Sequence, residues 1–220
     1  LIETYLEKGV QFCQGYGLTE TAPYVSVLSS KDSIKKKGSA GKALMFTDVC
    51  IVDTSGTVVP AMERGEICVS GPNVTAGYWG LEAATREAFD SNGRFLTGDI
   101  GYLDDEGYLF ICDRKKDMII SGGFNIYPRD LEDALLKLPE VVDAAVIGIP
   151  SKEWGETPLG FVVAAGGERL GLPAVCARVN AELGKTQRIS ALKQLDELPR
   201  SHIGKILKTT LRELVSSSRD

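Results

Sequence analysis

Gly15-Tyr16-Gly17-Leu18-Thr19-Glu20 is the first of several short motifs that together indicate how this chain folds and what it binds. The others follow in order along the chain: Thr97-Gly98-Asp99, Asp113-Arg114-Lys115-Lys116-Asp117 and Ser201-His202-Ile203-Gly204-Lys205. Together they supply an aromatic ring, carboxylates, a guanidinium and a lysine beside a glycine. These are the groups needed to hold a nucleoside triphosphate and to activate a carboxylic acid with it.

The composition is typical of a globular protein with one large or two small domains. The chain has 220 residues, of which 43% are hydrophobic and 25% are charged. We expect neither a transmembrane segment nor a signal peptide, because no apolar run approaches the ~20 residues of a membrane span. The net charge of -5 argues against a nucleic-acid surface. We therefore expect a cytoplasmic protein with small-molecule partners, whose oligomeric state is open.

The cysteines and the single histidine argue against a metal centre that is held by cysteine or histidine. Four of the five cysteines lie in apolar, strand-like runs, so we expect buried free thiols: Cys13, Cys50, Cys68, Cys112 and Cys176. His202 has no second histidine to share a metal ion, and no Ser-His-Asp triad is indicated.

Hydrophobic patterning up to residue 112 predicts mostly strands and turns. We expect a helix at 1–8, a buried strand at 10–13 and a helix near 82–89. Further strands are expected at 49–52, 65–70, 95–96 and 108–112. Short antiparallel strands joined by tight turns predict a small barrel or folded sheet.

The pattern changes after the Arg114-Lys115-Lys116-Asp117 run, where we place a boundary between 1–115 and 116–220. A hairpin is expected around Ser121-Gly122-Gly123, and Pro128 should open a helix. The apolar face of that helix is predicted to be Leu131, Ala134, Leu135 and Leu138. The remaining expected elements are strands at 141–149 and 159–165 and helices at 172–183 and 206–214. The predicted fold class is therefore mixed α/β, with a β-rich portion joined by a hinge to a compact α+β domain.

The order and wording of the motifs resemble those of the adenylate-forming enzymes, the superfamily of acyl-CoA synthetases, adenylation domains and luciferases. The resemblance runs from about Lys8 to about Arg212. It implies that 1–115 is the C-terminal portion of the large adenylation domain and that 116–220 is the mobile small domain. The family's phosphate loop lies upstream of the segment matching Gly15, and nothing here matches it. Because the chain also begins at Leu1, we expect a piece of a longer protein that has no measurable ligase activity alone.

The resemblance implies a nucleotide site. Tyr16, beside Gly17, matches the tyrosine that stacks on adenine in the family. Asp99 and Arg114 match its ribose-binding aspartate and arginine, and Ile111 is grouped with them as a nucleotide-binding residue.

The resemblance also implies catalytic groups. Thr19 would contact phosphate or carboxylate, and Glu20 would hold Mg²⁺. Lys205 matches the adenylation lysine, which would reach the triphosphate and the acyl carboxylate together.

The small domain would contribute a hinge and a thiol site. Lys116 matches the hinge position of the family. Gly122, Gly123 and Phe124 are expected to bind CoA, because the glycine matching Gly123 lines the pantetheine tunnel.

The implied reaction is ATP-dependent ligation of a carboxylic acid to CoA, with Mg²⁺ and an acyl-AMP intermediate. The sequences of Asp113–Met118 and Gly123–Pro128 most resemble those of fatty-acyl-CoA synthetases and favour that subclass. Malonyl-CoA and aryl-CoA synthetases, a peptide-synthetase adenylation domain and a non-catalytic binding module remain alternatives.

Overall fold

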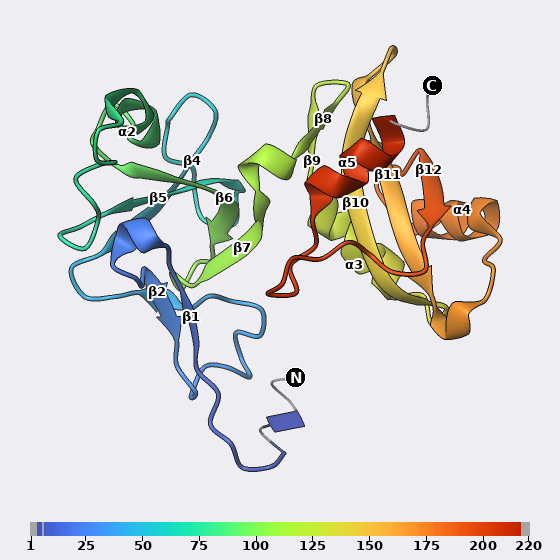
Figure 1. Cartoon of the computed structure of the whole chain (residues 1–220). Helices are drawn as coiled ribbons and strands as arrows, with labels where there is room; N and C mark the ends of the chain where they lie inside the picture. Colours follow the sequence, from blue (N-terminus) through green and yellow to red (C-terminus); the bar gives the residue numbers. More distant parts are fainter. Residues whose placement is uncertain (1–3, 6, 217–220) are drawn as a thin grey trace. The chain divides into compact units, whose positions relative to one another are not determined.

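The computed structural model describes residues 4–5 and 7–216 and has the mixed α/β fold that the sequence predicts (Figure 1). The chain divides into two compact units, Leu1–Lys115 and Lys116–Asp220. None of the helices formed by the described residues has the length and apolar character needed to cross a membrane.

Antiparallel sheets make up most of the first unit. In the smaller sheet the strand order is β1 (Gln14–Tyr16), β2 (Ser26–Leu28) and β3 (Lys42–Ala43). In the larger sheet it is β4 (Asp48–Val52), β5 (Gly65–Ser70), β6 (Phe95–Leu103) and β7 (Leu109–Arg114). A bridge between Gly41 and Leu109 connects the two sheets, in the part of the chain for which a small barrel or folded sheet was expected. The unit also contains helix α2 (Glu82–Ala88) and the 3-10 turn η1 (Thr19–Thr21).

The core of the first unit forms around β5, which is buried from Gly65 to Val69. Ile67 and Val69 pack there with Ile51 of β4 and with Leu109 of β7. Tyr16 and Leu18 pack against the same cluster. The apolar packing therefore anchors the segment that carries the first sequence motif to the larger sheet.

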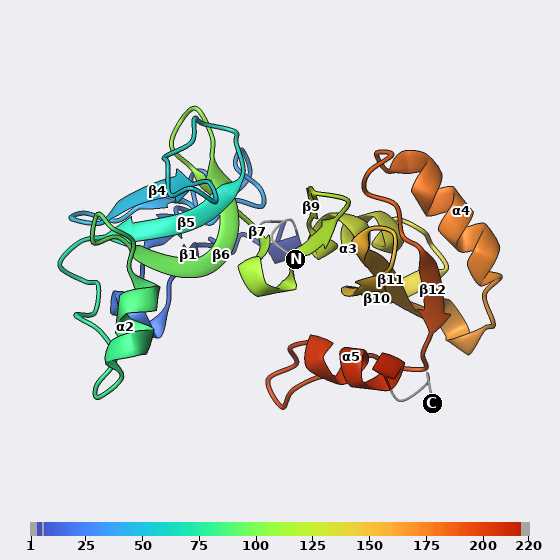
Figure 2. The same cartoon turned by 90° about the horizontal axis from the view of Figure 1, so that it is seen from above.

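The second unit is a twisted sheet covered by helices on both faces (Figure 2). The strand order is β10 (Val141–Ser151), β11 (Gly155–Ala164), β8 (Ile119–Ser121) and β9 (Phe124–Ile126), and β12 (Ala191–Gln194) runs parallel to β11. The helices are α3 (Pro128–Leu136), α4 (Leu172–Glu182) and α5 (Lys208–Ser216). A short 3-10 turn, η2 (Lys115–Asp117), spans the junction between the units, and another, η3 (Ala165–Gly167), follows β11.

Alternation along β10 explains the two covered faces. Ala144 and Val146 join the apolar cluster beneath α3 and α4, whereas Ala145 and Ile147 join the cluster beneath α5. Successive residues of a strand point to opposite faces, so a continuous apolar run suits a strand that is buried on both sides.

Most of the helices that the sequence predicts are confirmed. Helix α3 begins at Pro128 and buries Leu131, Ala134 and Leu135, with Leu138 packing just beyond its end. Helices α2, α4 and α5 lie within two residues of their expected bounds. Of the helix expected at 1–8, residues 1–3 and 6 lie outside the described residues, and Thr4 and Tyr5 are helical.

The strand expected at 10–13 is wrong. Pairing in this part of the chain begins at Gln14, which lies opposite Leu28, and Val10 is 46% exposed. A strand needs a hydrogen-bonded neighbour as well as apolar side chains, and only the residues after Cys13 have one. Strands β2, β3 and β12 were not predicted, because each has only two to four residues and therefore shows no clear pattern.

The expectation that four cysteines are buried is also wrong. All five lie in the described part of the chain, and only Cys68 is buried. Cys13 is exposed, and Cys50, Cys112 and Cys176 are partly exposed. An apolar run does not bury every member, because alternate residues of a strand face different surroundings.

Candidate functional site

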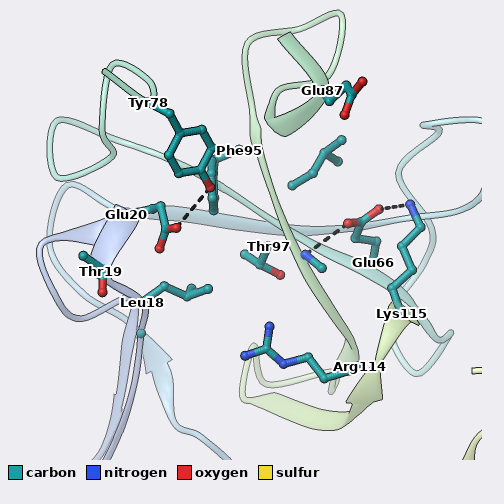
Figure 3. Close-up of a pocket in the computed structure, with 13 residues that line it drawn as sticks. Leu18, Thr19, Glu20, Glu66, Tyr78, Glu87, Phe95, Thr97, Arg114 and Lys115 are labelled. Atoms are coloured by element: carbon teal, nitrogen blue, oxygen red, sulfur yellow. Dashed lines mark hydrogen bonds and ion pairs between the residues drawn. The ribbon is translucent and has the colours of Figure 1, made fainter. Parts of the chain in front are cut away.

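A pocket of about 540 Å³ opens in the first unit, where several of the sequence motifs meet (Figure 3). Its wall includes residues from η1, from the start of β6 and from the end of β7, among them Thr19, Glu20, Thr97 and Arg114. Acidic and basic side chains face the same space, since Glu66 and Lys115 also line it. A polar pocket with both signs of charge suits a ligand with phosphate groups and a metal ion.

Hydrogen bonds of a buried side chain stabilise the turn that carries Thr19 and Glu20. The buried Thr21 hydroxyl accepts a hydrogen bond from the backbone N of Leu18 at 2.9 Å and lies 3.0 Å from the carbonyl oxygen of Leu18. A Cβ on Gly17 would lie 1.8 Å from the carbonyl oxygen of Pro23, so only glycine fits there. These contacts place Thr19 and Glu20 at the pocket wall.

Tyr78 orients the Glu20 carboxylate. The Tyr78 hydroxyl donates to Glu20 Oε1 at 3.0 Å, and the backbone N of Thr75 donates to the Glu20 carbonyl oxygen at 2.8 Å. Burial and the nearby Glu20 carboxylate raise the pKa of Tyr78, so the phenol remains a donor at neutral pH. The sequence analysis missed Tyr78, because a single tyrosine in a loop forms no periodic pattern.

Glu20 suits Mg²⁺ that is bound by substrate and water as well as by the protein. No group of three or more acidic, histidine or cysteine side chains among the described residues could hold a metal ion by itself. Mg²⁺ commonly takes one or two protein carboxylates and completes its coordination with water and substrate phosphates. A single oriented carboxylate facing a polar pocket therefore suits Mg²⁺ that arrives with a nucleotide.

Asp99 brings together residues that lie far apart in the sequence. Its Oδ2 accepts from the Tyr16 hydroxyl at 2.7 Å, and its Oδ1 lies 2.8 Å from Nε of Arg114. Asp99 and Arg114 are direct partners across β6 and β7, and Asp99 is 5% exposed. Burial and the Asp99 carboxylate raise the pKa of Tyr16. Of the group, Arg114 lines the pocket, whereas Tyr16, Asp99 and the 40% exposed Ile111 are not part of its wall.

Glu66 forms a second anchor that the sequence analysis missed. This buried carboxylate of β5 accepts from the backbone N of Gly98 at 3.1 Å and from Lys115 Nζ at 2.7 Å. A buried charge requires such partners. Glu66 thereby fixes the Thr97-Gly98-Asp99 segment from one side and the end of β7 from the other.

The predicted CoA hairpin connects β8 and β9 in the second unit. Gly122 and Gly123 have φ angles of +57° and +83°. A Cβ on Gly122 would lie 2.7 Å from the Trp154 ring, whereas a Cβ on Gly123 would meet nothing within 4 Å. A pocket of about 420 Å³ lies beside the hairpin and is lined by Phe124, Trp154, Lys185 and Arg188, among others. Aromatic faces with two cations suit a phosphorylated nucleotide.

Lys205 is presented by a tight turn in the second unit. Its carbonyl oxygen accepts from the backbone N of Ser201 at 2.8 Å, and Gly204 has φ of +82°. Arg200 Nη1 donates to the Gly204 carbonyl oxygen at 2.7 Å. The backbone is thus held, while the ammonium has no recorded partner among the described residues and is exposed.

Comparison with known families identifies the chain. Residues 1–79 match the model of the AMP-binding enzymes, and residues 130–205 match the model of the AMP-binding enzyme C-terminal domain. The chain belongs to the adenylate-forming superfamily. The order of its motifs and its mixed α/β fold agree with this membership.

Relatives within the superfamily are similar over nearly the whole chain. A 2-succinylbenzoate–CoA ligase from Bacillus cereus is 45% identical over 98% of this chain and 44% of its own length. A feruloyl-CoA synthase from an Amycolatopsis species is 45% identical over 96% of this chain and 43% of its own length. The chain thus spans less than half the length of these curated relatives.

A solved structure from the superfamily has the same fold. The o-succinylbenzoate CoA synthetase from Bacillus subtilis, in complex with its acyl-adenylate intermediate, matches with a TM-score of 0.84 and 39% identity. The match covers 96% of this chain and 43% of that one. The same enzyme in complex with ATP and a magnesium ion matches with a TM-score of 0.82.

The Tyr78–Glu20 hydrogen bond leads to a prediction for a protein of this superfamily. Tyr78→Phe removes the donor that orients the carboxylate, so the Mg²⁺ concentration that supports half-maximal ATP binding should rise about fivefold, as expected for loss of ~1 kcal/mol. Calorimetric titration of the full-length protein with ATP at several Mg²⁺ concentrations measures this. Tyr24→Phe is the matched control, because Tyr24 is exposed and its hydroxyl has no recorded partner among the described residues. An unchanged Mg²⁺ requirement in Tyr78→Phe would contradict the role.

Proposed function

We propose that the protein containing this chain is an ATP-dependent ligase that activates a carboxylic acid as acyl-AMP and transfers it to CoA. The observation that carries the proposal is the convergence of Glu20 and Arg114, from distant motifs, on one polar pocket. The 2-succinylbenzoate–CoA ligase and feruloyl-CoA synthase relatives support the reaction class.

The acid that we propose is an aryl carboxylic acid. Both named relatives act on acids that carry an aromatic ring, and they do not support the fatty acid that the motif wording favoured. Most of the acid pocket is proposed to lie in the remainder of the protein, so the described residues add nothing to this choice.

In the first half-reaction, a carboxylate oxygen attacks the α-phosphorus of ATP and the bond to pyrophosphate breaks. Arg114 and Lys205 supply positive charge, Arg114 as a planar guanidinium and Lys205 as a mobile ammonium. Glu20, oriented by Tyr78, would hold Mg²⁺, which neutralises phosphate charge when bound. Thr19 offers a hydroxyl at the same wall of the pocket.

The nucleoside is proposed to lie near Asp99. Both carboxylate oxygens of Asp99 are engaged, one by Tyr16 and one by Arg114. Each carboxylate oxygen has two lone pairs, so Asp99 could accept ribose hydroxyls while it keeps both contacts. Gly17 lets the backbone approach the ligand closely at this point.

In the second half-reaction, the CoA thiol attacks the acyl carbonyl carbon and AMP leaves. The Gly122-Gly123 hairpin is proposed to border the path of the pantetheine arm. The adjoining pocket would hold the phosphorylated end of CoA through Lys185 and Arg188, with Phe124 and Trp154 against the base.

Lys116 is proposed to be the hinge between the two half-reactions. Its neighbours are each tied to a different unit, since Lys115 Nζ bonds to Glu66 at 2.7 Å and Asp117 Oδ1 bonds to Arg212 of α5 at 2.9 Å. Lys116 itself is exposed and has no recorded side-chain partner among the described residues. Rotation of one unit against the other would thus concentrate in the φ and ψ angles of this residue.

A pyrophosphate-exchange assay on the full-length protein tests the reaction and the acid together. With a panel of aryl acids, fatty acids and malonate, exchange should be strongest with an aryl acid, and thioester should form only when CoA is added. Preference for a fatty acid would contradict the substrate class and leave the reaction intact. ATP binding without exchange for any acid would contradict the ligase and favour a binding module.

Lys205→Ala should lower the rate of acyl-AMP formation by at least ~100-fold, because the lysine meets charge that develops during adenylation. Thioester formation from supplied acyl-AMP should be largely retained. Single-turnover assays of each half-reaction measure both rates, and Lys137→Ala, which removes an exposed lysine after α3, is the matched control. Equal loss of both half-reactions would contradict a role confined to adenylation.

Gly123→Leu should block thioester formation and spare acyl-AMP formation, because the added side chain would occupy the proposed pantetheine path. Gly123 has positive φ, so any L-residue there also strains the backbone. Gly123→Ala is the matched control, since it carries similar backbone strain with little added volume. A normal acyl-CoA rate in Gly123→Leu, or an equal loss in both variants, would place the path elsewhere.

A further inference from the structure

Two cysteines face each other across neighbouring strands in the first unit. Cys50 of β4 and Cys68 of β5 are direct partners in the antiparallel register. Ile51 and Ile67, their sequence neighbours, point into the apolar core, so the two thiols lie on the other face of the sheet. Cys68 is completely buried, whereas Cys50 is partly exposed. Solvent molecules and small reagents therefore reach the pair through Cys50.

A fixed guanidinium contacts the accessible sulfur. Arg94 Nη1 lies 3.3 Å from Cys50 Sγ. The other nitrogens of Arg94 bind Asp90, with Nε donating to Oδ2 at 2.7 Å, and the Gly56 carbonyl oxygen, to which Nη2 donates at 3.1 Å. These bonds hold the guanidinium in place, and its remaining nitrogen, Nη1, contacts the sulfur. Such a contact favours the thiolate form, which is the reactive form of cysteine.

The surroundings of the pair shift the pKa values of the two thiols in opposite directions. The Cys68 thiol and the Arg94 guanidinium lower the pKa of Cys50, against the opposing effects of burial and the Asp90 carboxylate. The paired Cys50 and burial raise the pKa of Cys68. These effects favour the thiolate on the accessible Cys50 over the thiolate on the buried Cys68.

We propose that Cys50 is a peroxide-reactive modification site that Cys68 resolves into an intrachain disulfide. The Cys50 thiolate attacks a hydroperoxide, the O–O bond breaks, and the sulfur becomes a sulfenic acid. The leaving alkoxide or hydroxide takes a proton from solvent and becomes an alcohol or water. The Cys68 sulfur then attacks the Cys50 sulfur. The S–O bond breaks, and the hydroxyl leaves with the Cys68 proton as water.

The distance between paired residues of neighbouring antiparallel strands allows this disulfide. Residues directly opposite in an antiparallel pair have Cα atoms about 4.5 to 5.5 Å apart, in either hydrogen-bonding class. Disulfides form at Cα separations of about 4.4 to 6.8 Å. The bond would therefore need adjustment of the side chains and little movement of the strands.

The other thiols supply internal controls. Cys13 is exposed, so it exceeds Cys50 in accessibility, and no guanidinium contact is recorded for it among the described residues. Cys176 is partly exposed like Cys50, but its sulfur accepts from the neutral amide of Asn180 at 3.5 Å. Burial raises the pKa of Cys176. Faster reaction at Cys50 than at both of these would thus reflect the guanidinium and the paired thiol.

Peptide-level alkylation of the full-length protein is the first test. With limiting iodoacetamide at pH 7, Cys50 should react about tenfold faster than Cys13 and Cys176, because the rate follows the thiolate fraction. Trypsin separates the pair, since cleavage after Lys42, Arg64 and Arg86 places Cys50 in peptide 43–64 and Cys68 in peptide 65–86. Labelling of Cys50 at or below the rate of Cys176 would overturn the proposal.

Oxidation with hydrogen peroxide is the second test. After thiol blocking and non-reducing digestion, peptides 43–64 and 65–86 should appear as one cross-linked species. In Cys68→Ser, a sulfenic-acid trap should label peptide 43–64 instead. A protein that yields neither the cross-link nor the trapped sulfenic acid would refute the proposal.

The role of Arg94 is tested by two substitutions. Arg94→Gln should lower the alkylation rate of Cys50 to about that of Cys176, whereas Arg94→Lys should retain most of it because it keeps a cation. The comparison of wild-type peptides does not depend on either variant, so a folding defect in one of them leaves the proposal testable. Equal alkylation rates of Cys50 in the wild-type protein and in a folded Arg94→Gln variant would show that the guanidinium does not activate Cys50.

Discussion

The buried carboxylate of Asp99 links the parts of the first unit on which the candidate site depends. It joins β6 to β7 through Arg114 and to β1 through the Tyr16 hydroxyl. A charge that is 5% exposed requires partners, so these three strands cannot separate without leaving it uncompensated. The first sequence motif is therefore placed beside the pocket by an electrostatic requirement as well as by apolar packing.

Glu66 repeats this arrangement from the other side of the pocket. It holds the backbone N of Gly98 and the ammonium of Lys115, and thus the segment before Asp99 and the residue after β7. Asp99 thus fixes the Arg114 guanidinium, and Glu66 fixes the neighbouring Lys115. Preorganised charge of this kind costs little rearrangement when a phosphate arrives, which suits the adenylation chemistry that we propose.

Sequence patterns predicted those helices and strands whose start and buried face are determined by residues close together in the chain. Pro128 opens α3, and the spacing of Leu131, Ala134 and Leu135 gives its buried face. The same patterns did not find β1, because a three-residue strand is defined by its partner Leu28 and not by its own pattern. They also assigned the apolar run at 10–13 to a strand that has no partner to pair with.

The site was predictable only where residues occur in motifs. Asp99 and Arg114 were singled out by resemblance to a family, and the register of β6 and β7 then pairs them directly. Tyr78 and Glu66 belong to no motif that we recognised, and their roles emerge only when the chain brings them to Glu20 and Gly98. The catalytic lysine that we propose, Lys205, lies in the other unit. Because Lys115 is anchored to Glu66 and Asp117 to Arg212, the rotation that we propose between the half-reactions would concentrate in the two backbone angles of Lys116.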